Sequence, residues 1–402
     1  MAPAAIVHLD ADAFFVACEQ ARDPSLVGKK CAVGGRERGI ISSASYEARA
    51  CGVYTPMPTA QALRVCPGLV MIRHTPGLYG EVSQRMFDIC ESVTPLVQRN
   101  SIDEGYMDLG PCGHRSQGEV EAAVRSLQAR ILAQLKITVS MGIASNKMVA
   151  QIASKLRKPR GFVVVEPGGE AAFLEPLPLG RLPGIGAKTE AALVAKGLAV
   201  VGDLFRRSEG ELAAAFGRDW RRMLAIGRGE DESPVETSHD EAKSYSKQET
   251  FGVDTGDFQS VTQVAKGMID ELMPLVRADG ARVRTMTVRV RYPDLSYESC
   301  GQSIDTPTDL EGPFYGLAEP LLRGAWGRRR PVRLVSVRLS GVDSGPSQME
   351  MFGEQDERRR RLAGAIDRLN RGGRESVVVH GHRLRPGENG NKKQDTGPRG
   401  RP

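Results

Sequence analysis

Hydrophobic positions in the first 166 residues follow both strand and helix periods. Residues 5–9 are apolar and β-branched enough for a buried strand, and residues 137–143 alternate as another. Residues 95–109 have the pattern of strand, turn and strand. Apolar residues in 118–136 recur at helical spacing. The other elements expected here are a helix at 80–93, a helix from the cap Ser145 to about Arg157, and a strand at 162–165.

This order of elements predicts the topology of the first domain. Strand, helix, hairpin, helix and strand follow one another as in the ferredoxin-like βαββαβ arrangement, with an insertion after the first helix. In such a sheet the first strand lies beside the central hairpin. Residues at the end of the first strand should therefore lie close to residues of the hairpin turn.

The pattern changes after Pro167. Residues 171–228 are helical in character, and 230–243 are polar, charged and non-periodic, which predicts a linker. Strand patterns return at 246–253, 285–291 and 332–339, with helical patterns near 258–277 and 313–323. These elements predict a second, small α/β domain. A short helix is expected near 356–370, and 386–402 has the composition of a disordered tail.

Composition excludes several classes of protein. The 402 residues are 40% apolar and 26% charged, as in ordinary globular proteins, and no apolar run approaches the ~18 residues of a membrane span. The first residues lack the basic region of a signal peptide. Seven scattered cysteines, never spaced C-x-x-C, argue against a disulfide framework and a structural zinc site. We therefore expect a cytoplasmic protein without a membrane partner.

The net charge of +6 carries little information about a nucleic-acid partner. Residues 353–402 hold 13 Lys and Arg against 7 Asp and Glu, so the whole excess lies there and residues 1–352 are neutral. A role on nucleic acid must therefore depend on how the charges are arranged.

Two acidic motifs are the sharpest chemical feature. Asp10 and Asp12 end the first strand, and Asp103 and Glu104 lie in the predicted hairpin turn. Carboxylates brought together repel one another unless a cation lies among them, and oxygen-only ligands suit Mg²⁺ or Mn²⁺. Either motif alone would more often be a solvated strand end, but together they favour a metal site. Asp12 either shares the face of Asp10 or caps the following helix.

These motifs resemble the palm of a Y-family translesion DNA polymerase, of the DinB branch. Four further segments resemble family motifs in the same order along the chain, and the match covers about 5–342. They are 42–53 of the fingers, 142–150 and 158–161 at the end of the palm, and 182–189 of the thumb.

The resemblance implies an α+β multidomain fold. It would be a right-hand polymerase with a ferredoxin-like palm, short fingers, a helical helix-hairpin-helix thumb and a small α/β little finger. The expected boundaries are palm 1–19 and 77–166, fingers 20–76, thumb 167–230, linker 231–243, little finger 244–342 and tail 343–402.

The resemblance also assigns the acids. Asp10, Asp103 and Glu104 would be the catalytic acids and, with the Ala11 carbonyl, the ligands of two Mg²⁺ ions, or Mn²⁺ in their place. The reaction would be attack of a primer 3′-hydroxyl on the α-phosphate of a dNTP.

Further residues are implied for the nucleotide. Phe15 matches the steric gate that excludes a 2′-hydroxyl. Phe14 beside it is counted with the nucleotide residues, although core packing is the better interpretation of its ring. Alone, a surface arginine or lysine would be an ordinary solvated charge. The residues implied for the triphosphate and its surroundings are Phe14, Ser43, Tyr46, Arg49 and Lys158.

DNA contacts are implied in two places. The helix-hairpin-helix turn, with Gly184, Gly186 and Lys188, would present backbone N–H groups to a phosphate, although such a turn also simply joins helices. In the little finger, Arg289 and Arg291 share one strand face. Arg333 and Arg338 lie on another strand. A mixed-charge solvated sheet is the alternative.

Residues 348–352 resemble the peptide by which bacterial polymerases bind the sliding clamp, its β subunit. Gln348 would form hydrogen bonds, while Met351 and Phe352 would fill apolar pockets. Met351 replaces the commoner leucine, and the motif is internal. The alternative is that these side chains pack on the little finger.

The sequence thus predicts a template-directed translesion DNA polymerase with low fidelity and without proofreading. It would act as a monomer on primer-template DNA and dNTP, recruited by the clamp. Three alternatives are a UmuC-type subunit that needs accessory proteins, a catalytically silent relative that recruits others, and another palm-fold enzyme such as a nucleotidyl cyclase. The dense DinB-like motifs, the three acids and the thumb and little-finger motifs argue against these in turn.

Overall fold

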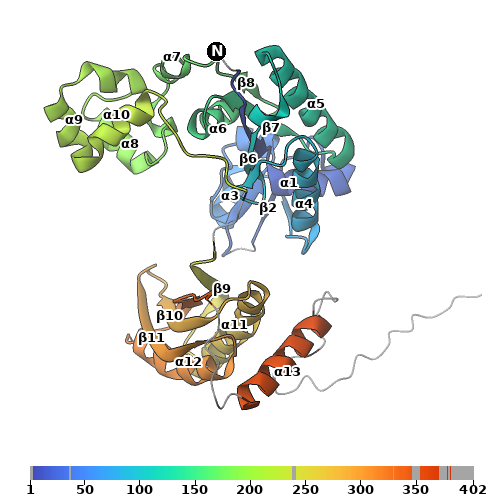
Figure 1. Cartoon of the computed structure of the whole chain (residues 1–402). Helices are drawn as coiled ribbons and strands as arrows, with labels where there is room; N and C mark the ends of the chain where they lie inside the picture. The colour runs from blue at the N-terminus through green and yellow to red at the C-terminus, as the bar shows by residue number, and fades with distance from the viewer. Residues whose placement is uncertain are drawn as a thin grey trace, which may run out of the picture. The chain divides into compact units, whose positions relative to one another are not determined.

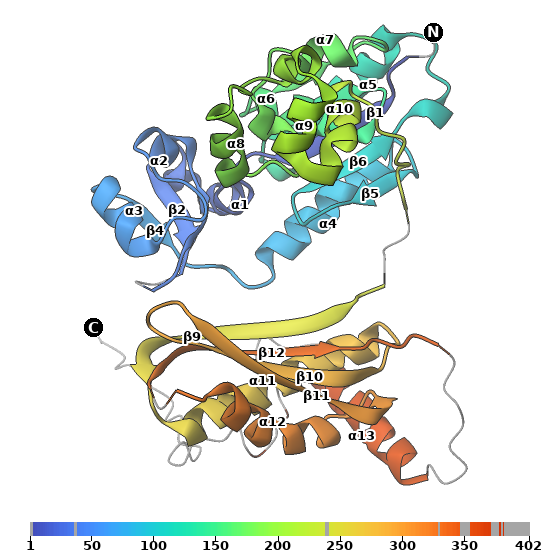
Figure 2. The ribbon, with the colours of Figure 1, turned by 90° about the vertical axis from the view of Figure 1, so that its left-hand side faces the viewer.

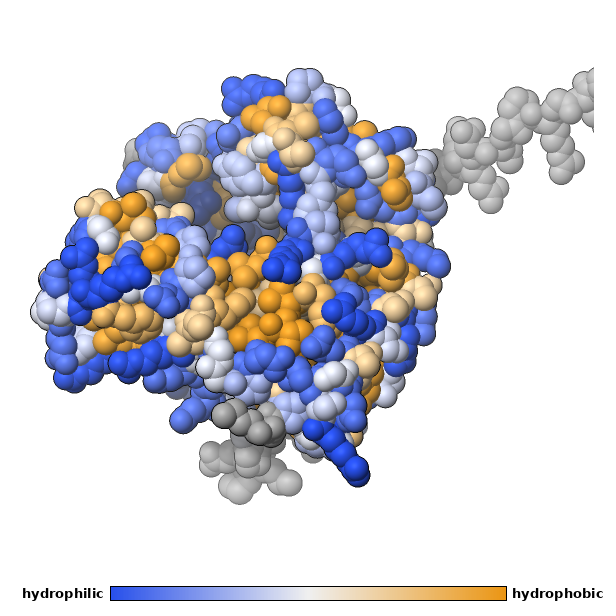
Figure 3. Space-filling model, turned by 90° about the horizontal axis from the view of Figure 1, so that it is seen from above, coloured by the Kyte–Doolittle hydropathy of each residue, from blue (hydrophilic) through white to orange (hydrophobic). Residues whose placement is uncertain are grey.

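The chain forms two compact units, Met1–His239 and Asp240–Pro402, which are coloured along the sequence in Figure 1. None of the helices in the described part of the chain is long and apolar enough to cross a membrane. On the face seen in Figure 3, strongly hydrophilic side chains border an apolar area near the centre. The computed structural model describes residues 3–35, 38–237, 241–328, 330–345, 354–370, 378 and 381.

A five-stranded sheet forms the centre of the first unit. Its strand order is β5-β6-β1-β7-β8, with β1 antiparallel to both β6 and β7 and β8 parallel to β7. This confirms the ferredoxin-like order, with β8 added at one edge. The strands are β1 (Ile6–Ala11), β5 (Val97–Arg99), β6 (Glu104–Asp108), β7 (Val139–Ala144) and β8 (Phe162–Val164).

Alternation along β1 divides the two faces of this sheet. Val7, Leu9 and Ala11 are buried in a core shared with helices α4 and α5, whereas Ile6 packs in a second core with α6. His8 and Asp10 share the parity of Ile6 and so face α6. The helices of this region are α1 (Phe14–Arg22), α4 (Leu78–Glu91), α5 (Gln117–Leu135) and α6 (Lys147–Leu156).

A glycine lets α6 approach this sheet closely. Gly142 lies on β7, directly across from His8 of β1. A Cβ at this position would lie 2.1 Å from the Ala150 carbonyl oxygen and 2.5 Å from the Ser154 amide nitrogen. Any other residue would therefore push the helix backbone away from the sheet.

The predicted cap of α6 was wrong by one residue. Asn146, not Ser145, is the N-cap, and its side chain accepts a hydrogen bond from the Val149 amide at 3.0 Å. The Ser145 hydroxyl instead donates to Glu170 at 2.5 Å. Both residues are good cap formers, so composition alone did not distinguish them.

A smaller sheet lies within residues 31–72. Its order is β3-β2-β4. Ile41 and Met57 belong to a separate core in this region, whereas Cys31 and Val33 of β2 pack in the core of the first sheet. Two short helices complete this region (Figure 2). The elements are β2 (Cys31–Gly34), β3 (Ile41–Ala44), β4 (Val70–Ile72), α2 (Tyr46–Ala50) and α3 (Thr59–Val65).

Residues 170–227 are helical, as the sequence predicted. The helices are α7 (Glu170–Leu174), α8 (Ala187–Val194), α9 (Glu209–Phe216) and α10 (Trp220–Gly227). The chain then returns to the start of α6. There the side-chain amide of Asn146 donates to the Gly229 carbonyl at 2.7 Å, and the Lys147 ammonium group donates to the Pro234 carbonyl at 2.9 Å. The first part of the predicted linker is therefore held against α6.

The second unit contains a four-stranded antiparallel sheet of order β11-β10-β12-β9, packed on two helices (Figure 2). Strand β11 was not predicted, because its sequence YESCGQSIDTPT carries few apolar residues and no residue in it is fully buried. The elements are β9 (Ser244–Thr255), β10 (Val283–Arg291), β11 (Tyr297–Thr308), β12 (Val332–Ser340), α11 (Phe258–Ala278) and α12 (Gly312–Ala325).

A last helix, α13 (Glu354–Asn370), confirms the short helix expected near 356–370. It is held on the second unit by Arg277, whose guanidinium donates to both Asp367 oxygens at 2.7 and 2.9 Å and lies 2.7 Å from Glu311. Asp367 is buried. Bidentate pairing of this kind fixes orientation as well as distance.

Candidate active site

The two acidic motifs meet at the end of β1. Asp10 and Glu104 are register partners on β1 and β6, and the Ala11 amide donates to the Asp103 carbonyl oxygen at 2.9 Å. The structure therefore brings Asp10, Asp103 and Glu104 to one edge of the sheet, as the predicted topology required.

Two lysine ammonium groups lie among these acids. Lys158 contacts the Asp10 carboxylate and donates to the Ala11 carbonyl at 3.3 Å. Lys155 lies 2.9 Å from a Glu104 oxygen and 4.0 Å from an Asp10 oxygen. Within the described ranges no three His, Cys, Asp or Glu side chains are grouped as metal ligands. Carboxylates and one carbonyl gathered around positive charge are the donors that Mg²⁺ prefers.

Burial and the lysines act in opposite directions on the acids. Burial raises the pKa of Asp10, and the nearby Lys158 only partly offsets this. Burial also opposes ionisation of Glu104, but hydrogen bonds from Lys155 and Asn100, together with the Lys155 charge, outweigh it and lower its pKa. Asp10 thus depends more than Glu104 on a further positive charge.

Asp12 does not cap helix α1, which excludes one of the two alternatives for this residue. The N-cap is Ala13, which has no side-chain cap, and Asp12 is buried. Its carboxylate accepts from the Ser140 hydroxyl and the Arg160 amide, both at 2.8 Å, and from the Tyr46 hydroxyl at 3.4 Å. Asp12 therefore joins β1 to β7, to the loop after α6 and to α2.

The residues expected at the triphosphate lie beside this junction. Ser43 is buried on β3, and its hydroxyl has no hydrogen-bond partner among the described residues. The Arg49 guanidinium stacks over the Tyr46 ring at 4.8 Å and donates to the Ala44 carbonyl at 3.0 Å. Desolvation by burial and the Asp12 charge raise the pKa of Tyr46, so it remains a hydroxyl donor.

The two adjacent phenylalanines have different environments. Phe14 is 3% exposed and belongs to the core, which agrees with a packing role for its ring. Phe15 is half-buried in an aromatic cluster, with ring centroids 4.7 Å from Tyr79 and 6.2 Å from His74. Phe15 therefore leaves part of its ring accessible, whereas Phe14 is enclosed in the core.

Sequence reasoning missed three groups next to the acids. These are His8, Ser154 and Lys155. His8 is fully buried, and desolvation by burial lowers its pKa to about 3 despite the opposing charge of Glu104. Its parity with Asp10 on the same strand was visible in the sequence. Its hydrogen-bond partner on α6, Ser154, is 146 residues away along the chain and gave no sequence signal.

The turn at 182–189 has a positive backbone φ at one of its glycines, a conformation that glycine favours. Gly184 has φ +88, and Gly186 is the N-cap of α8 without any side-chain cap. The first amides of α8 are thus unsatisfied by a cap, and Lys188 is exposed in its first turn. This arrangement suits an anion.

Three of the four predicted arginines of the second unit lie on one exposed face of its sheet. Arg289 pairs with Ser336 and Arg338 pairs with Thr287 across β10 and β12, so both lie on the exposed face of the sheet, as Arg291 does. Arg289 also stacks over Tyr297 at 4.8 Å. Arg333 is half-buried beside a register shift of β12.

The clamp-like residues Gln348, Met351 and Phe352 lie outside the described residues.

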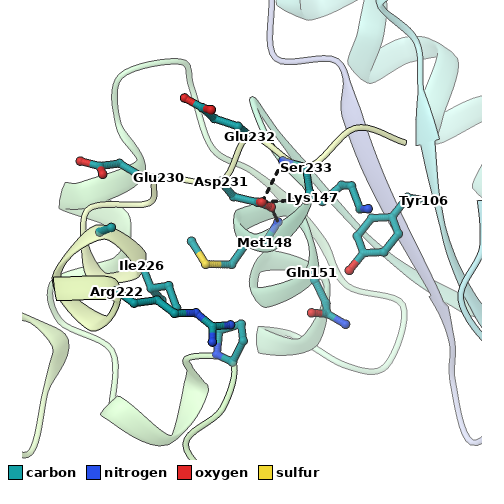
Figure 4. A pocket seen from close by; sticks show the side chains of 12 residues that line it. Tyr106, Lys147, Met148, Gln151, Arg222, Ile226, Glu230, Asp231, Glu232 and Ser233 are labelled. Carbon is teal, nitrogen blue, oxygen red and sulfur yellow. Dashed lines mark hydrogen bonds between the residues drawn. The ribbon is translucent and has the colours of Figure 1, made fainter. Parts of the chain in front are cut away.

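A pocket of about 550 Å³ lies in the first unit, between α6, α10 and the 230–233 segment (Figure 4). Asp231 accepts there from the Met148 amide at 2.9 Å and the Ser233 hydroxyl at 2.7 Å. None of the predicted site residues lines this pocket.

Comparison with known proteins matches nearly the whole chain. Residues 9–155 match the model of the impB/mucB/samB family, 242–351 match the C-terminal domain of that family, and 167–198 match the IMS family HHH motif. The chain is 63% identical over 380 residues to DNA polymerase IV of Opitutus terrae, covering 94% of this chain and 97% of that protein. DNA polymerase IV of Methanoculleus marisnigri is 35% identical, with coverage of 87% and 97%.

Solved structures give the same answer. A Y-family DNA polymerase chimera, Dbh-Dpo4(243-245)-Dbh, matches with a TM-score of 0.76 and 27% identity over 85% of this chain and 99% of that chain. An insertion ternary complex of Dbh DNA polymerase matches with a TM-score of 0.60 and 27% identity, covering 83% and 98%. The chain therefore belongs to the Y family of translesion DNA polymerases, in the DNA polymerase IV (DinB) branch, and is a DNA-directed DNA polymerase.

Proposed function

We propose that the polymerase reaction takes place at the acids of β1 and β6, with Asp10, Asp103, Glu104 and the Ala11 carbonyl holding two divalent cations. The observation that carries this is the Asp10–Glu104 register pair, with lysine ammonium groups among the acids. Two Mg²⁺ or Mn²⁺ ions would activate the primer 3′-hydroxyl and stabilise the leaving pyrophosphate. The negative charge of the acids would hold the two cations in place.

The triphosphate of the dNTP would lie toward α2 and the loop after α6. Ser43 offers a buried hydroxyl that has no other partner in the described ranges, and Tyr46 and Arg49 lie in the helix that follows. Lys158 lies 3.8 Å from the Asp12 carboxylate, which also accepts a hydrogen bond from the Tyr46 hydroxyl. Hydroxyl, guanidinium and ammonium groups are suited to phosphate oxygens.

Selection of the sugar would fall to Phe15. Its ring is half-buried and held by Tyr79 and His74, so it cannot easily turn away from an added hydroxyl. Phe14 lies behind it in the core and would act on the nucleotide only through Phe15.

Low fidelity, tolerance of damaged templates and lack of proofreading complete the proposal. The region expected to close over the nascent base pair has a three-stranded sheet and two short helices, which offer little surface for checking base-pair shape. Gly184, Gly186 and Lys188 would contact backbone phosphate, as would Arg289, Arg291 and Arg338, with Arg333 contributing less. Residues 348–352 would bind the sliding clamp, on the sequence motif alone.

Primer extension tests the catalytic assignment. The full chain with primer-template, four dNTPs and Mg²⁺ should extend the primer, while Asp103→Ala should lose at least about 100-fold in rate, because a lost ligand removes several kcal/mol of transition-state stabilisation. Asp88→Asn, an exposed carboxylate on α4, is the control and should retain the wild-type rate. Full activity of Asp103→Ala would contradict the assignment, and inactive wild type would favour the silent scaffold.

A further inference from the structure

His8 is a buried polar side chain whose Nε2 faces the Glu104 carboxylate. It is 0% exposed, and it lies two residues before Asp10 on the same face of β1. Its Nδ1 lies 2.7 Å from the Ser154 hydroxyl oxygen. Its Nε2 has no hydrogen-bond partner among the described residues, and the nearest Glu104 oxygen lies 4.0 Å away. A buried ring nitrogen without a hydrogen-bond partner is energetically costly, so its presence calls for an explanation.

The fold holds the imidazole in this orientation from two sides. Gly142 admits the backbone of α6 close to β7, which brings Ser154 against His8. On the other side, the Tyr106 ring of β6 lies edge-on with its centroid 4.7 Å from the imidazole centroid. The ring therefore has a fixed direction, along which Glu104 lies.

The position of the ring proton follows from the Ser154 hydroxyl. That hydroxyl has one hydrogen and two acceptors within reach, the Gln151 carbonyl at 2.9 Å and His8 Nδ1 at 2.7 Å. Donation to Gln151 would leave the Nε2 lone pair facing the negative Glu104 carboxylate. Donation to Nδ1 makes Nε2 the protonated nitrogen, which faces that carboxylate with an N–H. Electrostatics favours the second arrangement.

We propose that His8, held in the Nε2–H form by Ser154, is a positioning residue for Glu104. This inference rests on the proposed role of Glu104. A movement of about 1 Å would bring the carboxylate oxygen from 4.0 Å to hydrogen-bond distance. Lys155, which now contacts the same oxygen, is 39% exposed, whereas His8 is buried and fixed. When a divalent cation binds the acids in place of the Lys155 ammonium group, His8 remains a donor directed at Glu104.

Three substitutions of His8 separate the N–H from the packing of the ring. His8→Phe fills the space without a donor, His8→Asn keeps only the Ser154-facing position, and His8→Gln keeps a donor at the Nε2 position. The measurement is the affinity of the full chain for Mn²⁺ alone, by electron paramagnetic resonance, with kcat and KM for dNTP beside it. We expect His8→Phe and His8→Asn to lose about 10- to 100-fold in Mn²⁺ affinity, and His8→Gln to retain most of it.

Two results would overturn the inference. One is wild-type Mn²⁺ affinity in His8→Phe, and the other is an equal loss in His8→Gln and His8→Phe, which would make the ring structural. Ser154→Ala should weaken Mn²⁺ binding less than His8→Phe does, since it removes only the group that fixes the tautomer. Thermal unfolding of each variant confirms that it is folded.

A spectroscopic test reads the tautomer in the wild-type protein and uses a variant only to assign the signal. In ¹⁵N-histidine-labelled wild-type protein without metal, one histidine should show a protonated Nε2 and an unprotonated Nδ1, and His8→Gln should lack this signal. The opposite tautomer at His8 would contradict the proposal.

A double-mutant cycle keeps this inference separate from the proposed function. If His8 acts through Glu104, adding His8→Phe to Glu104→Gln should cause no further loss of Mn²⁺ affinity. Full primer extension by Glu104→Gln would refute the catalytic role of Glu104 itself. Loss of extension in Glu104→Gln, with additive losses in the cycle, would refute only the role of His8.

Discussion

The acids at the end of β1 and the arginines on the sheet of the second unit hold their charges in different ways. Asp10, Asp12 and Glu104 are buried or half-buried, and each contacts lysine, hydroxyl or amide groups from separate parts of the chain. Arg289, Arg291 and Arg338 are exposed on one face of a sheet whose opposite face packs on helices.

This difference fits the two tasks that we propose for these regions, nucleotidyl transfer and contact with the DNA backbone. Moving a phosphoryl group requires reacting atoms held to a fraction of an ångström, so the charges must be embedded in a network. Contact with a nucleic-acid backbone of any sequence requires attraction without fixed register, so exposed charges are sufficient. Substitutions in the two regions should therefore fail in distinct ways.

The largest effect is expected at Asp10. Asp10→Asn removes the charge that Lys158 now contacts, and we expect primer extension to fall by at least about 100-fold, because cation binding is lost. The dissociation constant for primer-template, measured by fluorescence anisotropy, should stay at its wild-type value. A parallel loss of DNA binding would mean that the two regions are not functionally separate.

Phe15 should show an intermediate effect. Phe15→Ala opens the space beside the sugar, and we expect kcat/KM for rNTP relative to dNTP to rise at least about 10-fold, equivalent to 1.4 kcal/mol. Single-nucleotide incorporation measures this ratio.

Phe14→Ala is the matched control for that change. Because Phe14 is buried in the core, its loss should lower the free energy of unfolding by about 3–5 kcal/mol without changing sugar selection. A gain of rNTP incorporation in Phe14→Ala and not in Phe15→Ala would reverse the assignment of the gate.

The smallest effect is expected for single arginines of the second unit. Arg289→Ala should weaken primer-template binding at low salt and reduce the slope of log K against log salt by about 1, because one phosphate contact is lost. The rate of incorporation at saturating DNA should not change. Salt titrations on two unrelated duplex sequences give the measurement, and an effect confined to one sequence would argue against backbone contact.

Much of the first unit was predictable because its polar and apolar positions alternate clearly. The strand at 5–9 and the hairpin at 95–109 defined the sheet, and the sheet topology placed Asp10 beside Glu104. Strand β11 was missed because a strand with little burial carries few apolar residues. Its place in the sheet comes from pairing with β10, which the local sequence does not encode.

The environment of the acids was less predictable than the acids themselves. The sequence left open whether Asp12 shares the face of Asp10 or caps the following helix, because its partners Ser140 and Arg160 come from 128 and 148 residues away. Lys155 and Ser154 looked like an ordinary helix end. Only the close approach of α6 at Gly142 brings them to β1.

The Ser43 hydroxyl, which has no hydrogen-bond partner in the described part of the chain, has opposite consequences for the free protein and for the nucleotide complex that we propose. A buried hydroxyl without a partner costs roughly 1–3 kcal/mol, and a triphosphate oxygen bound there as proposed would recover that amount. Replacing Ser43 by alanine would thus make the resting enzyme more robust and the nucleotide complex weaker. Selection for stability alone would therefore favour alanine at this position, whereas selection for nucleotide binding would favour serine.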